Sequence, residues 1–289
     1  MSKYRGRGDT LCSVSTTDQV LIIGLGHTGT VLAERLTGRG VHVVGTVRSE
    51  EKAQTLALPG LEVRVADLAV PETLARLCPE GAAIVVTSPP VDGGLAALFA
   101  AAEAAHPRSL TLVGTTGVYL EADGGRVTPE APVKPEDDPR AGPRLADERT
   151  LRETADRWEV PGMVFRAAGI YGRGRGLEHR LREGRVRLWG GGHNLLNRIH
   201  VDDLAALLEA AIARPHAGIF NAADDHPCTL AEHAGWLVGQ LGLPPPPRAP
   251  LEDAPSPTLV GSKHVDATAS WETFGVVPRY PTYKDGFRG

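Results

Sequence analysis

Two kinds of hydrophobic segment alternate along the first half of the chain. Short apolar runs rich in β-branched residues predict buried strands, and the segments between them carry apolar residues at helical spacing. The predicted strands are 19–23, 41–47, 61–66, 83–87 and 109–113, and the predicted helices are 28–39, 50–58, 71–77 and 95–105. Strands that alternate with helices predict an α/β fold with a parallel sheet and right-handed crossovers.

This alternation stops after residue 120. The Gly124-Gly125 pair and five prolines between residues 121 and 143 predict an irregular surface segment. Further helices are expected at 145–158, 202–213 and 229–241, and further strands at 162–166 and 218–221. The prolines between residues 244 and 257 predict a stiff, extended connection.

The first predicted strand runs directly into a glycine motif, G-x-G-x-x-G. Gly24 permits a tight turn, Gly26 lets the backbone approach a pyrophosphate, and Gly29 lets the following helix pack close to the strand. The helix N-terminus adds N–H groups and the positive end of its dipole. The motif therefore predicts a Rossmann-type, doubly wound sheet whose cofactor-binding residues include Gly24, Gly26, His27, Thr28 and Gly29.

The residues after the second strand indicate whether the cofactor is NAD or NADP. NAD sites usually place an acidic residue there, which bonds the ribose 2′-hydroxyl. In this chain the first acidic residue after the second strand is Glu50. Arg48 can instead pair with a 2′-phosphate, and Ser49 can add a hydroxyl, although a solvated Arg48 is the alternative. NADP is therefore the predicted cofactor, with NAD as the alternative.

Other cofactor contacts are predicted where the third and fourth strands end. Ligands of doubly wound sheets lie at the carboxyl ends of strands. Asp67, after the third strand, can bond the adenine amino group or, equally well, cap the next helix. Thr87, Ser88 and Pro89, after the fourth strand, are expected over a ribose.

Composition and charge narrow the class of protein. The chain has 289 residues, a net charge of -4, and 42% hydrophobic and 23% charged residues, which is typical of soluble globular proteins and gives no reason to expect nucleic-acid binding. Its three cysteines (12, 78 and 228) form no C-x-x-C, so no disulfide framework is expected. Reduced thiols in the cytoplasm are expected instead. Residues 1–17 predict a disordered leader rather than a signal peptide, and no apolar run is long enough for a membrane span.

Four further segments make the chain resemble the extended short-chain dehydrogenase/reductases, also called the NAD-dependent epimerase/dehydratase family. They are V-G-T-T-G-V-Y at 113–119, R-A-A-G-I-Y-G at 166–172, R-I-H-V-D-D-L-A at 198–205 and F-N-A-A-D-D at 220–225. The resemblance implies one domain over residues 18–289, with a small C-terminal substrate lobe from about 165–197 and 228–289. It also implies a homodimer formed through the helices at 95–105 and 145–158.

The catalytic pair of that family is absent. The resemblance implies Tyr-x-x-x-Lys-x-x-x-Glu, but the corresponding residues here are Arg140, Arg144 and Glu148. Arginine does not give up a proton near neutral pH, so Arg140 cannot act as the base, whereas Arg144 can hold a ribose or a phosphate of the cofactor. The chain thus resembles the atypical branch, the nucleoside-diphosphate-sugar-epimerase-like proteins that lack the pair.

Three residues near the end of the fifth strand are the catalytic candidates. Thr115 and Thr116 occupy the place of the family's catalytic Ser/Thr, although β-branched residues commonly end strands. Tyr119 is the leading candidate for a replacement acid/base, and the alternative is a packing residue with a bonded hydroxyl.

Substrate-binding residues are predicted among basic side chains. Arg166, Arg173 and Arg175 begin an arginine-rich stretch that suits an anionic substrate, although a solvated helix face is the alternative for part of it. His200 is included as a residue that titrates in the useful range, with a buried structural role, before a capping Asp202, as the alternative. No spacing of ligands predicts a metal site.

The sequence therefore leads to a first hypothesis and two rivals. The first is an NADP-binding oxidoreductase or epimerase-like enzyme with a non-standard catalytic set, acting on a small polar, anionic or nucleotide-linked substrate. The second is a non-catalytic NADP(H)-binding redox sensor or regulatory protein. The third is a protein that has lost cofactor binding as well.

Overall fold

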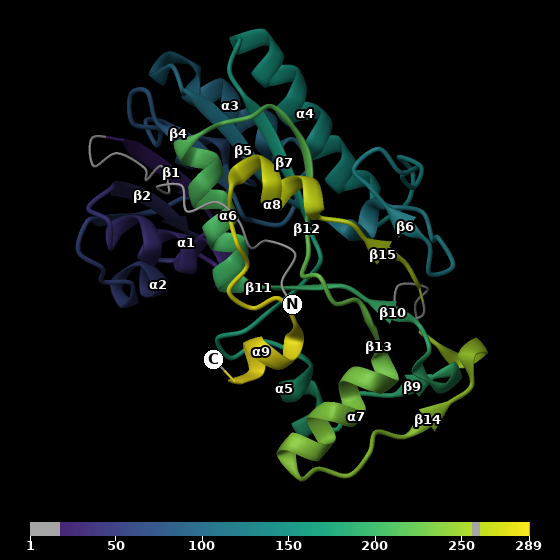
Figure 1. The fold of residues 1–289 in the computed structure, drawn as a ribbon. Coiled ribbons are helices and arrows are strands. Elements are labelled where there is room, and N and C mark those ends of the chain that lie inside the picture. The colour runs from purple at the N-terminus through teal and green to yellow at the C-terminus, as the bar shows by residue number, and fades with distance from the viewer. Residues whose placement is uncertain (1–17, 256–260, 289) are drawn as a thin grey trace.

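A seven-stranded parallel sheet lies at the centre of the computed structural model, which describes residues 18–255 and 261–288. Its order is β12-β7-β5-β4-β1-β2-β3, and every pairing within it is parallel. The strands are β1 (Gln19–Ile23), β2 (His42–Val47), β3 (Leu61–Val65), β4 (Ala83–Val86), β5 (Ser109–Thr115), β7 (Gly162–Ala167) and β12 (Gly218–Ala222). The prediction of a Rossmann-type α/β fold is confirmed (Figure 1).

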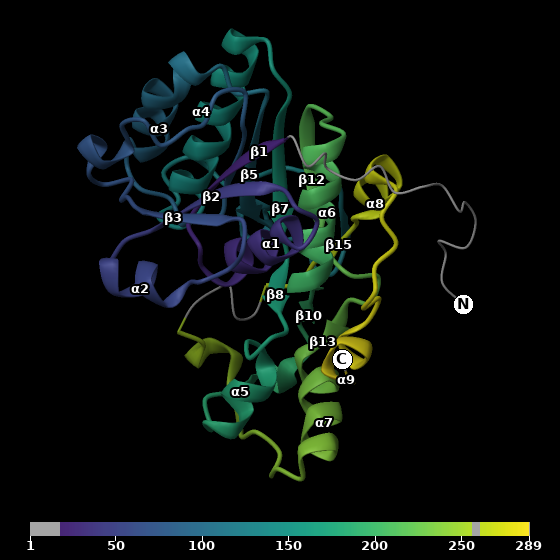
Figure 2. The same cartoon turned by 90° about the vertical axis from the view of Figure 1, so that its left-hand side faces the viewer.

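Helices cover both faces of this sheet (Figure 2). Apolar residues of α1 (His27–Thr37), α6 (Val201–Ala213) and α8 (Thr268–Phe274) share one buried cluster with one face. Those of α3 (Gly94–Ala102), α4 (Gly142–Trp158) and the 3-10 helix η1 (Pro71–Leu74) share another cluster with the opposite face. The short helix α2 (Glu50–Thr55) connects β2 to β3, and the 3-10 helices η2 (Glu103–Ala105) and η3 (Thr116–Val118) flank β5.

Several predicted helices have different bounds in the structure; the helix expected at 50–58, for example, ends at Thr55. The helix expected at 71–77 is only the single turn of η1, because Ala75 turns to extended backbone and Arg76 has a φ of 57°. The helix expected at 145–158 begins earlier, at Gly142, with Pro143 in its first turn, where a missing N–H costs nothing. Arg140 therefore precedes α4 instead of lying on it.

A smaller group of elements packs beside the carboxyl ends of the strands, and we call it the C-terminal lobe. It contains α5 (Leu177–Arg182), α7 (Leu230–Leu241), α9 (Tyr283–Arg288), the 3-10 helices η4 (Gly190–Gly192) and η5 (Leu251–Asp253), and the strand pairs β9 (Leu188–Trp189) with β14 (Arg248–Ala249) and β10 (Leu195–Leu196) with β13 (Cys228–Thr229). Both views show α5 and α7 on the same side of the sheet (Figures 1 and 2). The lobe has a small apolar core of its own around Leu181, Val186 and Leu237.

Two further strand pairs join the lobe to the sheet. β8 (Gly169–Tyr171) pairs with β11 (Arg198–His200), and β6 (Arg126–Val127) pairs with β15 (His264–Val265). β6 lies inside the segment predicted to be irregular, most of which has no regular structure. The predicted leader, 1–17, and part of the proline-rich connection, 256–260, lie outside the described residues. Across the described ranges, no helix has the length and apolar character needed to cross a membrane.

Candidate functional site

The main candidate site is a pocket of about 660 Å³ at the carboxyl ends of β1, β2, β3 and β4. Neighbours of β1 come from both directions of the chain, β2 on one side and β4 on the other, so the pocket lies at the switch point where ligands bind in such sheets. Eight of the predicted cofactor residues line it: Gly24, Gly26, Arg48, Ser49, Asp67, Thr87, Ser88 and Pro89. The structure thus brings together residues predicted from four separate strand ends.

The glycine loop is held rigidly and leaves room for a ligand. Gly24 has a φ of +96°, a conformation that favours glycine, and its carbonyl accepts a hydrogen bond of 2.6 Å from Thr87 Oγ1. A Cβ on Gly29 would lie 2.2 Å from that same carbonyl oxygen, so helix and loop could not pack as they do. A Cβ on Gly26 would meet nothing within 4 Å of the described chain. Gly26 therefore faces the open space in which a pyrophosphate would lie.

Thr28 and His27 belong to the first turn of α1 and do not line the pocket directly. Thr28 is buried, so its contribution to a cofactor would come from its backbone N–H. Burial and the charges of Arg175 and Arg173 lower the pKa of His27, which makes its imidazole neutral near pH 7. Its Nε2 is buried without a hydrogen-bond partner among the described residues.

The rim of the pocket beyond β2 is cationic. Arg48 and Ser49 are exposed, and the Ser49 hydroxyl caps α2 by accepting a hydrogen bond from Lys52 N. Lys52 itself also lines the pocket, a contact that the sequence-based prediction missed although the residue lies in the first turn of α2. Asp67 lines the pocket and accepts a hydrogen bond of 2.9 Å from Ala69 N, but it does not cap the next helix, since η1 has Val70 at its N-cap position and no side-chain capping bond.

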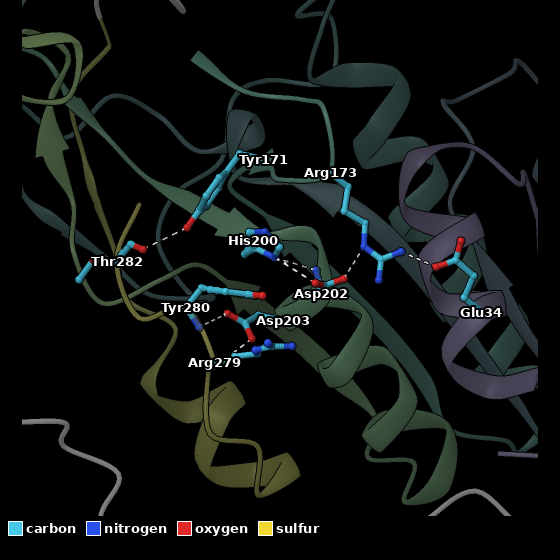
Figure 3. Close-up of polar contacts among 9 residues, drawn as sticks. All are labelled: Glu34, Tyr171, Arg173, His200, Asp202, Asp203, Arg279, Tyr280 and Thr282. Atoms are coloured by element: carbon cyan, nitrogen blue, oxygen red, sulfur yellow. Dashed lines mark hydrogen bonds and ion pairs between the residues drawn. The ribbon is translucent and has the colours of Figure 1, made fainter. Parts of the chain in front are cut away.

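The basic segment after β8 forms a tight turn, not a flexible loop. Gly172 and Arg175 exchange two backbone hydrogen bonds, of 2.7 and 3.1 Å, around Arg173 and Gly174, which both have positive φ. The Arg173 guanidinium forms ion pairs with Glu34 of α1 and, at 2.8 Å, with Asp202 of α6 (Figure 3). Arg173 therefore ties the turn to two helices, and its charge is already paired with two carboxylates.

Two predicted site residues, Arg166 and Tyr119, are instead buried in the core. The Arg166 guanidinium bonds the Glu148 carboxylate at 2.7 Å and lies over the Tyr119 ring at 4.8 Å. Tyr119 is fully buried, its hydroxyl donates to Asn221 Oδ1 at 2.6 Å, and burial raises its pKa. These internal contacts favour the alternative for Tyr119, a packing residue with a bonded hydroxyl, over the predicted acid/base role, and they hold the Arg166 guanidinium away from the predicted contact with substrate.

His200 has a structural role as well. It is 3% exposed, lies between the rings of Tyr171 and Tyr280, and its Nδ1 accepts a hydrogen bond from Asp202 N, so it caps α6 (Figure 3). Burial lowers its pKa, so the imidazole is neutral. These contacts favour the alternative of a buried structural group over the predicted substrate contact, and the residue that caps α6 is His200, where Asp202 was expected.

The remaining catalytic candidates lie at the end of β5. Thr115 Oγ1 accepts a hydrogen bond of 3.1 Å from Gly117 N and so caps η3, while Thr116 lines a small cavity of about 130 Å³. Arg140 is exposed before α4, and Arg144 is half-buried in the first turn of that helix. Within the described residues, no three His, Cys, Asp or Glu side chains are grouped as around a metal ion.

Part of the chain is similar to known proteins. Residues 24–152 match the model of an NAD(P)H-binding family. A 3-diazoavenalumate denitrifying reductase from Streptomyces is 29% identical over 143 residues, which is 44% of this chain and 46% of that protein, so the match spans about half of the relative.

Solved structures match over nearly the whole chain. A functionally unknown conserved protein from Silicibacter pomeroyi is 29% identical, with a TM-score of 0.78, over 94% of this chain and 97% of that one. The Thermus thermophilus UDP-glucose 4-epimerase, solved with NAD, is 20% identical, with a TM-score of 0.79, over 93% and 96%. The family match over residues 24–152 and the fold shared with these structures agree with the resemblance drawn from the motifs: the first half of the chain is similar to NAD(P)H-binding domains.

Proposed function

We propose that the protein is an NADP-dependent oxidoreductase or epimerase-like enzyme with a non-standard catalytic set, acting on a small polar, anionic or nucleotide-linked substrate. The observation that carries the proposal is the pocket at the ends of β1 to β4, with an open approach at Gly26 and a cationic rim. The names of the similar proteins, a reductase and an epimerase solved with NAD, support hydride chemistry.

Different residues of the chain would bind different groups of the cofactor. Arg48, Ser49 and Lys52 would hold a 2′-phosphate, and Asp67 would bond the adenine. Gly26 and the N-terminus of α1 would receive the pyrophosphate. Arg175 adds positive charge beside His27, so we assign it to these phosphates in place of the substrate. The bound nicotinamide supplies or accepts a hydride.

The reacting centre is assigned to the end of β5. Thr115 and Thr116 would bond a substrate oxygen, and Arg144, half-buried on α4, would hold a ribose or phosphate. None of these groups releases a proton near neutral pH, in contrast to the tyrosine of the usual pair. The enzyme would therefore depend on orientation and charge more than on a protein base.

Replacing Arg48 with alanine is expected to weaken NADPH binding by about 10- to 100-fold, since a charged hydrogen bond contributes about 1.5–3 kcal/mol. NADH has no 2′-phosphate, so its affinity should change less than about twofold. Intrinsic fluorescence titration of both cofactors measures the difference, and Lys52→Ala should act in the same direction. Arg152→Ala, an exposed arginine on α4, is the matched control. An equal loss for NADH and NADPH would contradict the NADP assignment.

Turnover separates the enzyme from the redox sensor. The sensor remains a candidate because Tyr119 is buried and arginines occupy the two usual catalytic positions. We expect NADPH absorbance to fall with at least one member of a panel of aldehydes, ketones and nucleotide sugars. Tight NADPH binding without turnover across the whole panel would favour the sensor, and no binding of either cofactor would reject both functions.

A further inference from the structure

Lysine is rare in this chain, and three of its lysines line cavities. Five of the 31 Lys and Arg residues are lysines, at positions 3, 52, 134, 263 and 284. Lys52 lines the dinucleotide pocket, whereas Lys134 and Lys263 together line the small cavity that contains Thr116. The two cavities share no lining residue among those described. The second cavity is therefore a separate feature, adjacent to the proposed reacting centre.

The backbone around Lys263 is fixed from several sides. Asn197 donates its amide to Lys263 O at 2.8 Å and accepts from Val265 N at 2.8 Å. Ser262 accepts hydrogen bonds from Leu195 N and from Gly124 N. The next residues form β15, which pairs with β6. Several hydrogen bonds thus hold this lysine near the end of β5.

The Lys263 side chain is also held in place, with part of its donor capacity unused. Its side chain is 12% exposed, and Nζ lies 3.3 Å from Glu121 Oε1 and 3.4 Å from Tyr119 O. The Glu121 carboxylate fits against Gly261, where a Cβ would lie 2.4 Å from Oε2. An ammonium group has three donors, so these two long contacts leave capacity for a ligand in the cavity.

Charge and size indicate what the cavity can hold. Its described lining contains two lysines and one glutamate, so it favours a negatively charged group. Its volume of about 130 Å³ is small beside the roughly 300–1,000 Å³ of sites that enclose a whole small molecule. It therefore suits one group of a larger ligand, with the hydroxyl of Thr116 next to it.

We propose that Lys134 and Lys263 form an anion subsite beside Thr116, which binds a carboxylate or phosphate group of the substrate. The proposal rests on the proposed function, because it names the substrate class of that same reacting centre. It also moves anion recognition away from Arg173, whose guanidinium is engaged by Glu34 and Asp202. The two lysines come from segments far apart in the sequence: Lys134 N donates to Val118 O, and Lys263 directly precedes β15, which pairs with β6.

Labelling with pyridoxal 5′-phosphate tests the subsite on the full-length protein. Its phosphate would bind one lysine while the amine of the other attacks the aldehyde carbon, a C=N bond forms, and water leaves. Borohydride then adds hydride to that carbon, which makes the label permanent, and peptide mass spectrometry measures the label at each lysine. We expect Lys134 or Lys263 to be labelled at least about tenfold faster than Lys284. The factor corresponds to the one charged contact that the label's phosphate gains in the cavity and lacks at Lys284.

Competition and variants complete the test. Inorganic phosphate or malonate should protect the pair, and whichever protects better identifies a phosphate or a carboxylate as the favoured group. Lys263→Met should slow labelling of Lys134, whereas Lys263→Arg keeps the charge and should preserve it. Labelling no faster than at Lys284, or unaffected by either anion and by Lys263→Met alike, would overturn the subsite.

The same samples separate this proposal from the proposed function. NADPH should protect Lys52, which lines the dinucleotide pocket, without depending on the subsite. If Lys52 is not protected although phosphate protects Lys263, the cofactor assignment fails and an anion site remains. If Lys52 is protected and the pair is not labelled, the subsite fails and the cofactor assignment stands.

Discussion

Gly26→Ala is expected to weaken NADPH binding by at least about tenfold, which corresponds to about 1.4 kcal/mol, without lowering the free energy of unfolding. Gly26 has a φ of -86°, which alanine adopts readily, and its Cβ would meet no atom of the described chain. The new methyl group would instead occupy the space in front of the N-terminus of α1. Titration of NADPH and chemical denaturation measure the two quantities on the same sample.

Gly29→Ala, three residues away, is the matched control. Its Cβ would lie 2.2 Å from Gly24 O and 2.8 Å from Thr87 Oγ1, so the loop or the helix must move. Overpacking of this kind typically costs about 1–3 kcal/mol, and we expect the free energy of unfolding to fall by at least that much. If Gly26→Ala binds NADPH as the wild type does, the pyrophosphate does not lie at this loop and the cofactor site is wrongly assigned.

The second large effect is expected in the core. Glu148→Ala should lower the free energy of unfolding by about 3–5 kcal/mol, because it leaves the Arg166 guanidinium buried without its carboxylate. Both side chains are 5% exposed, and Arg166 is held further by Pro129 O at 3.2 Å. Guanidinium denaturation measures the change.

Two variants show whether the lost charge pair is responsible. Glu183→Ala removes a carboxylate from a pair with Arg185 in which both side chains are more than half exposed, and it should cost less than about 1 kcal/mol. Glu148→Leu combined with Arg166→Met should be more stable than Glu148→Ala alone, since neither charge is then left unpaired. A double variant as unstable as the single one would show that cavity formation, not charge, determines the effect.

The dinucleotide pocket was predictable from the sequence because its residues follow directly from chain geometry. Gly24, Arg48, Asp67 and Ser88 each come just after a predicted strand. Parallel strands place their carboxyl ends along the same edge, so a sequence that specifies the strands also specifies which residues meet there. Lys52 was missed because it lies one helical turn beyond its strand end.

The direction of a side chain was harder to predict. Tyr119 follows η3 with extended backbone, which points its ring under Arg166 and its hydroxyl at Asn221. Every residue of β7 is buried, so alternation along that strand gives no sign that Arg166 points inward to Glu148. A buried polar residue needs a partner, but that partner is identified only once helix and strand are packed.

The lysine cavity was missed for a different reason. Lys134 belongs to an irregular segment and Lys263 directly precedes a strand of two residues, where hydrophobic periodicity carries no information. Lys134 is held beside the cavity by the hydrogen bond from its N–H to Val118 O, and Lys263 comes close to it through the pairing of β6 with β15, a contact between distant parts of the sequence.

That pairing also affects the order in which the protein is completed during synthesis. All seven strands of the central sheet and the whole dinucleotide pocket precede residue 223, whereas β15 begins at His264. Because chains are made from the N-terminus and their earlier parts fold first, the nascent protein can assemble its cofactor half while β6 still lacks a partner. A chain that stopped after residue 255 would lack both the lysine cavity and the α8 residues Trp271 and Phe274, which complete the core on one face of the sheet.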